Sequence, residues 1–215
     1  MRLAVLGGSF NPIHLGHLAL AASAKKELGY TKIAIIPAFI SPFKQQLAKS
    51  PQVSPQDRLR MIELAILTIP YVYCEHYEID RQGVSYTVDT INYLYKKFSK
   101  PNEISKEPLS GKIGLIIGDD LAKSFLFWKG RDEILQKTDI IIGKRNTITA
   151  MQKNGINGSK HSSLAPYPYP YTELKNKALS ISSTEIRNAV KAGKEFKHFL
   201  PIPVYNYIEK NGLYL

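Results

Sequence analysis

Two histidines stand three residues apart behind a pair of glycines near the start of the sequence. The string GGSFNPIHLGH spans residues 7–17 and contains His14 and His17. An apolar run precedes it and a stretch with helical spacing follows it, so we expect it to join a buried strand to the N-terminus of a helix. Side chains three residues apart share one side of a helical turn, and a helix N-terminus offers unpaired N–H groups and partial positive charge. The string therefore predicts a phosphate site with two imidazoles beside it.

The other residues of this string suit the same chemistry. Gly7 and Gly8 let the backbone approach a ligand without a Cβ in the way. Ser9 and Phe10 would offer backbone N–H groups, and Gly16 would keep the helix N-terminus open. A bare HxxH pattern is more often helix capping or chance than a site, and zinc needs at least three protein ligands. It is the double glycine behind a strand that favours a nucleotide triphosphate here over a bound metal.

A second string near the other end of the sequence follows the same principle. In ISSTEIR, Ser182 precedes a glutamate by three residues, which is a capping box and by itself would explain the pattern. Ser183 and Thr184 add hydroxyls at this predicted helix start, and Arg187 lies one turn further on. The string therefore predicts a second anion site. Two such helix starts, from opposite ends of the chain, could hold one triphosphate between them.

Short apolar runs alternate with stretches of helical spacing along the chain. We expect strands at 3–8, 32–38, 72–75, 112–118, 139–143 and 178–181, and helices at 17–28, 54–67, 84–98, 183–193 and 203–210. This alternation predicts an α/β fold, a Rossmann-like doubly wound parallel sheet with helices on both faces. Such sheets bind ligands at the carboxyl ends of their strands.

Domain organisation and composition indicate an ordinary folded protein. We expect one domain over 1–215, with the segment 144–177 as a surface loop, since its run PYPYPY favours an extended polyproline-like conformation. The chain has 215 residues, 44% of them hydrophobic, and a single cysteine. One cysteine cannot close an intramolecular disulfide, and no apolar run approaches the roughly 20 residues of a membrane helix. We therefore expect a cytoplasmic protein that does not insert into membranes.

The net charge of +11 is the unusual bulk property. A basic balance favours anionic partners, which could be nucleic acid or small phosphorylated molecules. No sequence pattern of a nucleic-acid-binding module is present, so we expect no nucleic acid as partner.

The chain resembles the bacterial nicotinate-nucleotide adenylyltransferases, which belong to the nucleotidyltransferase superfamily that shares the HxGH motif with class I aminoacyl-tRNA synthetases. The resemblance rests on GGSFNPIHLGH together with further segments spread over nearly the whole chain except 144–177. These are SPFK (41–44), RLRMIELAI (58–66), RQGVSYTVDTI (81–91), LIIGDD (115–120), Trp128, IIIGKR (140–145), ISSTEIR (181–187) and YIEKNGLY (207–214). It implies transfer of AMP from ATP to nicotinate mononucleotide, with release of pyrophosphate, and Mg²⁺ bound with ATP mainly through phosphates.

The resemblance also implies roles for individual residues. Catalytic positions would be His14, His17, Lys44 and Arg187; ATP would be bound by Gly7, Gly8, Ser9, Phe10, Gly16, Ser182, Ser183 and Thr184; and the mononucleotide would be bound by Ser85, Tyr86, Thr87, Asp120, Trp128 and Arg145. Ser85 would equally serve as the N-cap of the helix expected at 84–98, and Trp128 as ordinary core. Two departures stand out: Phe43 precedes Lys44 where the family usually has histidine, and Asn11 stands where aspartate is commoner.

Several alternatives remain open at the level of sequence. A preference for nicotinamide mononucleotide differs from the expected activity only at the ring substituent, and a pantetheine-phosphate adenylyltransferase shares the HxGH motif. A basic nucleic-acid-binding protein and a nucleotide sensor without turnover are alternatives from other classes. The sequence leaves a homo-oligomer open as well.

Overall fold

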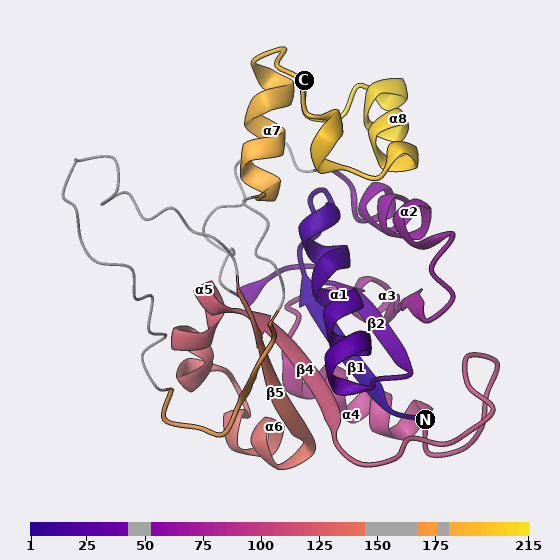
Figure 1. Ribbon diagram of the computed structural model, residues 1–215, viewed down its shortest axis with the longest axis vertical. Coiled ribbons are helices and arrows are strands. Elements are labelled where there is room, and N and C mark those ends of the chain that lie inside the picture. The colour runs from indigo at the N-terminus through magenta and orange to yellow at the C-terminus, as the bar shows by residue number, and fades with distance from the viewer. Residues whose placement is uncertain (43–52, 145–166, 176–180) are drawn as a thin grey trace.

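The centre of the molecule is a parallel sheet in which the chain winds outward in both directions from the first strand. The computed structural model describes residues 1–42, 53–144, 167–175 and 181–215. Within these residues the sheet has six strands in the order β3-β2-β1-β4-β5-β6, all parallel (Figure 1). Their bounds are β1 (Leu3–Gly8), β2 (Lys32–Pro37), β3 (Val72–Cys74), β4 (Ile113–Gly118), β5 (Thr138–Gly143) and β6 (Thr172–Glu173). This order confirms the predicted Rossmann-like doubly wound fold.

The central strands are apolar on both sides because helices cover both faces of the sheet. All six residues of β4 are buried, as parallel strands of this kind require. One face packs against α1 (Leu15–Leu28), α2 (Pro55–Ile66), α7 (Ser183–Lys191) and α8 (Ile202–Asn211). The other face packs against α4 (Thr87–Lys97), α5 (Asp119–Ala122), the 3-10 turn Lys123–Phe127 and α6 (Arg131–Lys137). Two apolar cores, one on each side, therefore hold the sheet.

Local sequence rules account for most element boundaries. Gly29 ends α1 in the left-handed conformation with φ of 71°, as glycine commonly does. Ser54 caps α2 by accepting a hydrogen bond from the Asp57 N–H, and Pro55 occupies the first helical position. Gly212 ends α8 in the same left-handed way. The bounds of these three helices lie within two residues of the predicted ranges 17–28, 54–67 and 203–210.

Some short helices and one cap differ from the predictions. The helices α3 (Tyr77–Arg81), α5 and α6 were not expected, because so few residues show no helical period. The helix α4 begins at Thr87 and its N-cap is Tyr86, so the prediction of Ser85 as N-cap is wrong. The Ser85 hydroxyl instead accepts the N–H of Phe39 at 3.0 Å.

The prediction of a surface loop over 144–177 is wrong for residues 167–175. Tyr167 and Tyr169 are buried, and the Tyr169 hydroxyl donates to the Ala122 carbonyl at 2.6 Å. The strand β6 pairs in parallel with β5. Alternation of proline and tyrosine places every second side chain on one side of an extended chain, so the tyrosines can pack inward. Residues 145–166 lie outside the described part.

Two smaller expectations concern the remaining segments. Of the strand expected at 178–181, residues 178–180 lie outside the described part, and Ile181 belongs to no strand. Among the described residues, no helix has both the length and the apolar character needed to cross a membrane.

Candidate active site

The site lies where the strand order reverses, at the carboxyl ends of β1 and β4. The chain leaves this edge in opposite directions after the two strands, and doubly wound sheets bind their ligands at such a point. Gly7 and Gly8 end β1 here. A Cβ built on Gly7 would meet no described atom within 4 Å, whereas one on Gly8 would lie 3.2 Å from the Phe10 ring. Gly7 thus faces open space at this edge, and Gly8 makes room for a neighbouring side chain.

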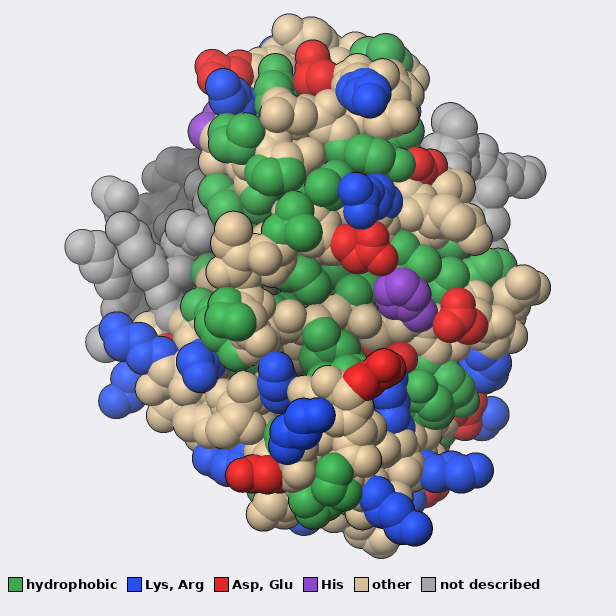
Figure 2. All heavy atoms as spheres, turned by 90° about the vertical axis from the view of Figure 1, so that its right-hand side faces the viewer, with side chains coloured by type: hydrophobic (Ala, Val, Ile, Leu, Met, Phe, Trp, Pro, Cys, Tyr) green, Lys and Arg blue, Asp and Glu red, His purple; other side chains and the backbone are tan. Residues whose placement is uncertain are grey.

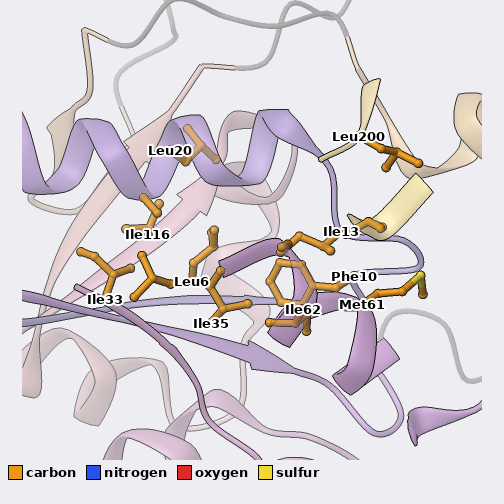
Figure 3. Close-up of a cluster of buried hydrophobic side chains, with 14 of the residues drawn as sticks. Leu6, Phe10, Ile13, Leu20, Ile33, Ile35, Met61, Ile62, Ile116 and Leu200 are labelled. Atoms are coloured by element: carbon orange, nitrogen blue, oxygen red, sulfur yellow. The ribbon is translucent and has the colours of Figure 1, made fainter. Parts of the chain in front are cut away.

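The loop from β1 to α1 is anchored by two apolar side chains. Phe10 is 2% exposed and Ile13 is fully buried. Figure 3 shows both among the side chains of α2, close to Met61 and Ile62. Phe10 also has a φ of 45°, a left-handed conformation that is uncommon for a bulky residue. Its side chain therefore serves the core, and any contact of Phe10 with a nucleotide falls to its backbone.

His14 and His17 form a stacked pair at the start of α1. Their ring centroids are 3.7 Å apart with an angle of 29° between planes, and both side chains are buried. The His14 N–H donates to Nδ1 of His17 at 3.2 Å, so in neutral His17 the proton sits on Nε2. A Cβ on Gly16 would lie 3.0 Å from Nδ1 of His14. A larger residue at position 16 would therefore press on the His14 ring. The predicted placement of the two rings on one side is confirmed, and His14 is also the N-cap of α1.

The start of α7 contacts the loop that precedes α1. The Ser183 hydroxyl donates to the Pro12 carbonyl at 2.9 Å, and Nη1 of Arg187 donates to the Asn11 carbonyl at 2.8 Å. In Figure 1 the first turn of α7 stands beside the loop that enters α1. The prediction that two helix starts from distant parts of the chain converge is therefore confirmed.

The hydroxyl groups at the start of α7 are used within the protein. The Ser182 N–H donates to Oε2 of Glu185 at 2.9 Å, and the Glu185 N–H donates to the Ser182 hydroxyl at 3.1 Å. This is the predicted capping box. The Thr184 hydroxyl accepts a hydrogen bond from Nη2 of Arg187 at 3.1 Å. The Ser182 and Ser183 hydroxyls therefore donate within the protein, whereas the Thr184 hydroxyl, which accepts here, keeps its own proton to donate.

Arg58 is a residue of the site that the sequence analysis did not single out. It is 6% exposed on α2, and Nη1 donates to the carbonyls of Ser9 and Ala38 at 2.8 and 2.7 Å. Burial lowers the pKa of its guanidinium. One buried cation thus ties the loop after β1 to the loop after β2. An arginine on the apolar face of a predicted helix, alongside Met61 and Ile62, was the available signal.

The residues expected around the mononucleotide are gathered near the start of α4. The Ser85 N–H donates to the Ile40 carbonyl at 2.9 Å, which ties this segment to the loop after β2. Thr87 is the first residue of α4, and the Tyr86 ring lies 4.2 Å from Nζ of Lys129. This brings Tyr86 next to the segment that contains Trp128.

Glu78 is hydrogen-bonded to side chains of this region, and the sequence analysis did not single it out either. It is 7% exposed and accepts a hydrogen bond from the Thr90 hydroxyl. Burial is the main cause that raises the pKa of its carboxyl group, while hydrogen bonds from Thr90 and Ser85 act in the opposite direction.

Asp120 and Trp128 follow β4, the other strand at this point. Asp120 lies in the first turn of α5, directly after the strand. Trp128 is half-buried and packs against Phe125 with ring centroids 5.3 Å apart. It also borders an open surface depression of about 380 Å³ beside the start of α6, which Leu126, Phe127 and Arg131 help to line. Lys44 and Arg145 lie outside the described residues.

Comparisons with known proteins agree with this geometry. The family model described as cytidylyltransferase-like matches residues 5–189. A relative from Treponema pallidum, named "Probable nicotinate-nucleotide adenylyltransferase", is 37% identical over 214 residues, covering 100% of this chain and 99% of the relative. A relative of the same name from Dictyoglomus thermophilum is 34% identical over 217 residues, covering 100% of both chains.

A solved structure shares the fold over almost the whole length. It is the nicotinic acid mononucleotide adenylyltransferase of Plasmodium falciparum complexed with NaAD, with a TM-score of 0.70 and 15% sequence identity, covering 99% of this chain and 97% of that one. The sheet order and the family match point to the same group of proteins. The chain belongs to the cytidylyltransferase-like family and, within it, to the nicotinate-nucleotide adenylyltransferases.

Proposed function

We propose that this chain transfers the AMP part of ATP to nicotinate mononucleotide, giving deamido-NAD and pyrophosphate. The observation that carries the proposal is the contact between the two helix starts, made by Ser183 with Pro12 and by Arg187 with Asn11. This contact places two positively polarised helix ends and the histidine pair at one edge of the sheet. A triphosphate is the ligand that such an arrangement suits.

The proposed reaction needs little covalent chemistry from the protein. The nucleophile is the phosphate of the mononucleotide, which carries about −1.5 to −2 charges at neutral pH because its second pKa is about 6. It therefore needs no general base. What remains is to hold the two phosphates in line and to offset the charge that develops on the α-phosphate and the leaving pyrophosphate.

The histidine pair and Arg187 are the groups placed for this task. Since Nδ1 of His17 accepts the His14 N–H, Nε2 of His17 is the nitrogen that can donate to a phosphate oxygen. The two rings stack with their centroids 3.7 Å apart, so both lie at the same start of α1. Arg187 adds a permanent charge, and Lys44, outside the described residues, would add another.

Mg²⁺ is part of the proposal and would be bound together with ATP, mainly through the phosphates. When bound, it neutralises phosphate charge. Among the described residues, Asp119 and Asp120 follow β4 at the same edge, and their carboxylates would supply oxygen ligands of the kind that magnesium prefers.

The surroundings of Tyr86 favour the nicotinate ring over the nicotinamide ring. The ring would lie among Tyr86, Thr87 and Trp128, where flat aromatic faces suit stacking. The ammonium group of Lys129 lies over the Tyr86 ring. A cation there attracts the carboxylate of nicotinate and gains less from a neutral amide.

Pyrophosphate release from ATP and Mg²⁺ tests the proposal. Nicotinate mononucleotide, nicotinamide mononucleotide and pantetheine phosphate are compared as acceptors, with a reaction lacking acceptor as the blank. We expect release with nicotinate mononucleotide and at least tenfold less with the other two. Faster release with another acceptor would replace the proposed substrate, and ATP binding without release would indicate a sensor.

The same protein preparation tests the nucleic-acid alternative that the net charge of +11 suggests. On the face shown in Figure 2, basic side chains are most frequent in the lower part and acidic side chains lie among them, so they form no continuous basic band there. We expect only weak, strongly salt-dependent binding to nucleic acid. Tight binding at physiological salt together with absent turnover would favour that alternative.

A further inference from the structure

The phosphate loop, residues 9–14 between β1 and α1, is held by groups from two other elements. The Ser9 carbonyl accepts from Arg58 of α2, and the Asn11 and Pro12 carbonyls accept from Arg187 and Ser183 of α7. A peptide group is planar, with its C=O and N–H pointing in opposite directions. Fixing these carbonyls therefore fixes the orientation of the peptide groups along the loop.

The side chain of Asn11 is held as well, by Tyr214. The Tyr214 hydroxyl donates to Oδ1 of Asn11 at 2.7 Å, across a sequence separation of 203 residues. Tyr214 has a φ of 71°, which L side chains rarely adopt. Burial raises the pKa of its phenol, so the hydroxyl keeps its proton and remains a donor. Asn11 thus links Tyr214, through its side chain, to Arg187, through its carbonyl.

We infer that Tyr214 is a positioning residue for ATP. Its hydroxyl fixes Asn11, and through Asn11 it fixes the phosphate loop and the guanidinium of Arg187 in the orientation that receives the triphosphate. The inference rests on the proposed function, because it names a residue that prepares the proposed ATP site. Tyr214 itself touches no residue expected around the mononucleotide among the hydrogen bonds of the described part.

The same helical region offers a matched control. The Tyr207 hydroxyl donates to Oδ1 of Asp57 at 2.7 Å and so links α8 to α2. Replacement of Tyr207 or Tyr214 by phenylalanine removes one hydroxyl and one hydrogen bond of the same length. The hydrogen bond of Tyr214 ends on the phosphate loop, whereas that of Tyr207 ends on the first turn of α2.

The experiment compares Tyr214→Phe with Tyr207→Phe in the full chain. We expect Tyr214→Phe to raise KM for ATP about threefold to tenfold, the value of one lost hydrogen bond between neutral groups. We expect KM for nicotinate mononucleotide to stay within about twofold. Tyr207→Phe should keep both KM values within about twofold of those of the parent protein. It should lower Tm by about as much as Tyr214→Phe does.

A double-mutant cycle separates positioning from general stability. Asn11→Ala removes the other partner, so Asn11→Ala combined with Tyr214→Phe should raise KM for ATP no more than Asn11→Ala alone. Should Tyr214→Phe unfold at the assay temperature, Asn11→Ala carries the same expectation for KM at the same contact.

The outcomes distinguish this inference from the proposed function. If the parent protein releases pyrophosphate and Tyr214→Phe leaves KM for ATP within twofold, the inference is overturned and the proposed function stands. Equal rises in KM for Tyr214→Phe and Tyr207→Phe would also overturn it. If the parent protein releases no pyrophosphate with any acceptor, the proposed function itself fails.

Discussion

His17 shows how one hydrogen bond decides what a side chain can do. Because its Nδ1 is occupied by the His14 N–H, its remaining nitrogen is fixed as a donor. We expect His17→Ala to lower kcat by about 10²–10³, the usual effect of removing one donor to developing charge, with a much smaller change in KM for ATP. Steady-state kinetics would check this, with His76→Ala as control, since the His76 ring lies beside Glu63 and belongs to neither of the two helix starts at the phosphate loop. An unchanged kcat for His17→Ala would remove it from the reaction.

Glu78 gives a prediction about pH. Its pKa is raised by burial above the ordinary value of 4.5, so the folded state favours the protonated form. Its contribution to stability is present at acidic pH and is lost as pH rises through the raised pKa. We expect Glu78→Gln to be more stable relative to the parent protein at pH 7 than at pH 4, as measured by urea unfolding. An equal difference at both pH values would show that the carboxylate is not destabilised by burial.

The position of the histidine pair, Ser183 and Arg187 at two helix starts could be predicted, because each lies in a short string whose residue types and spacing indicate the start of a helix. Arg58 and Tyr214 could not be located in the same way. Their hydrogen bonds end on carbonyls or amides far away in the sequence, and such contacts leave no periodicity or spacing. The same limit explains why the prediction of Ser85 as an N-cap was wrong. Its hydroxyl bonds to the backbone of residue 39 and not to the helix that it precedes.

At the scale of elements, the capping box of α7 joins stability to the site. Ser182 caps the helix, and the next residue, Ser183, bonds to Pro12 of the phosphate loop. We expect Ser182→Ala to lower the free energy of unfolding by about 1 kcal/mol, measured by urea unfolding. Ser110→Ala is the control, because Ser110 is exposed and lies in no helix; its effect should stay within about 0.5 kcal/mol. Equal effects of the two changes would contradict the capping role.

Elements with several buried residues or a clear cap were predicted well, and short ones were not. The strands β1 and β4 each have six residues, enough for an apolar run to stand out. β6 has two residues, and its neighbourhood carries a proline run that indicates a loop. There, packing of Tyr167 and Tyr169 against the sheet outweighs the local preference of the prolines.

At the scale of the whole molecule, the sheet is tightly packed within and open at its carboxyl edge. A Cβ on Gly114 in the middle of the sheet would lie 2.5 Å from Cζ of the buried Tyr30, whereas a Cβ on Gly7 at the edge meets no described atom within 4 Å. We expect Gly114→Ala to lower the free energy of unfolding by about 1–3 kcal/mol. Gly7→Ala should leave stability within about 0.5 kcal/mol and weaken ATP binding. Urea unfolding and calorimetry would measure the two effects, and a reversed pattern would place the ligand elsewhere.

The pairing of Asn11 with Tyr214 has a consequence for the order of events during synthesis. A ribosome adds about 5–20 residues per second, so the 203 residues between the two partners need on the order of 10–40 s. Throughout that interval the phosphate loop exists without the tyrosine whose hydroxyl holds the Asn11 side chain. A nascent chain stalled before residue 214 should therefore hold ATP poorly, and full affinity should arise only after this tyrosine has emerged.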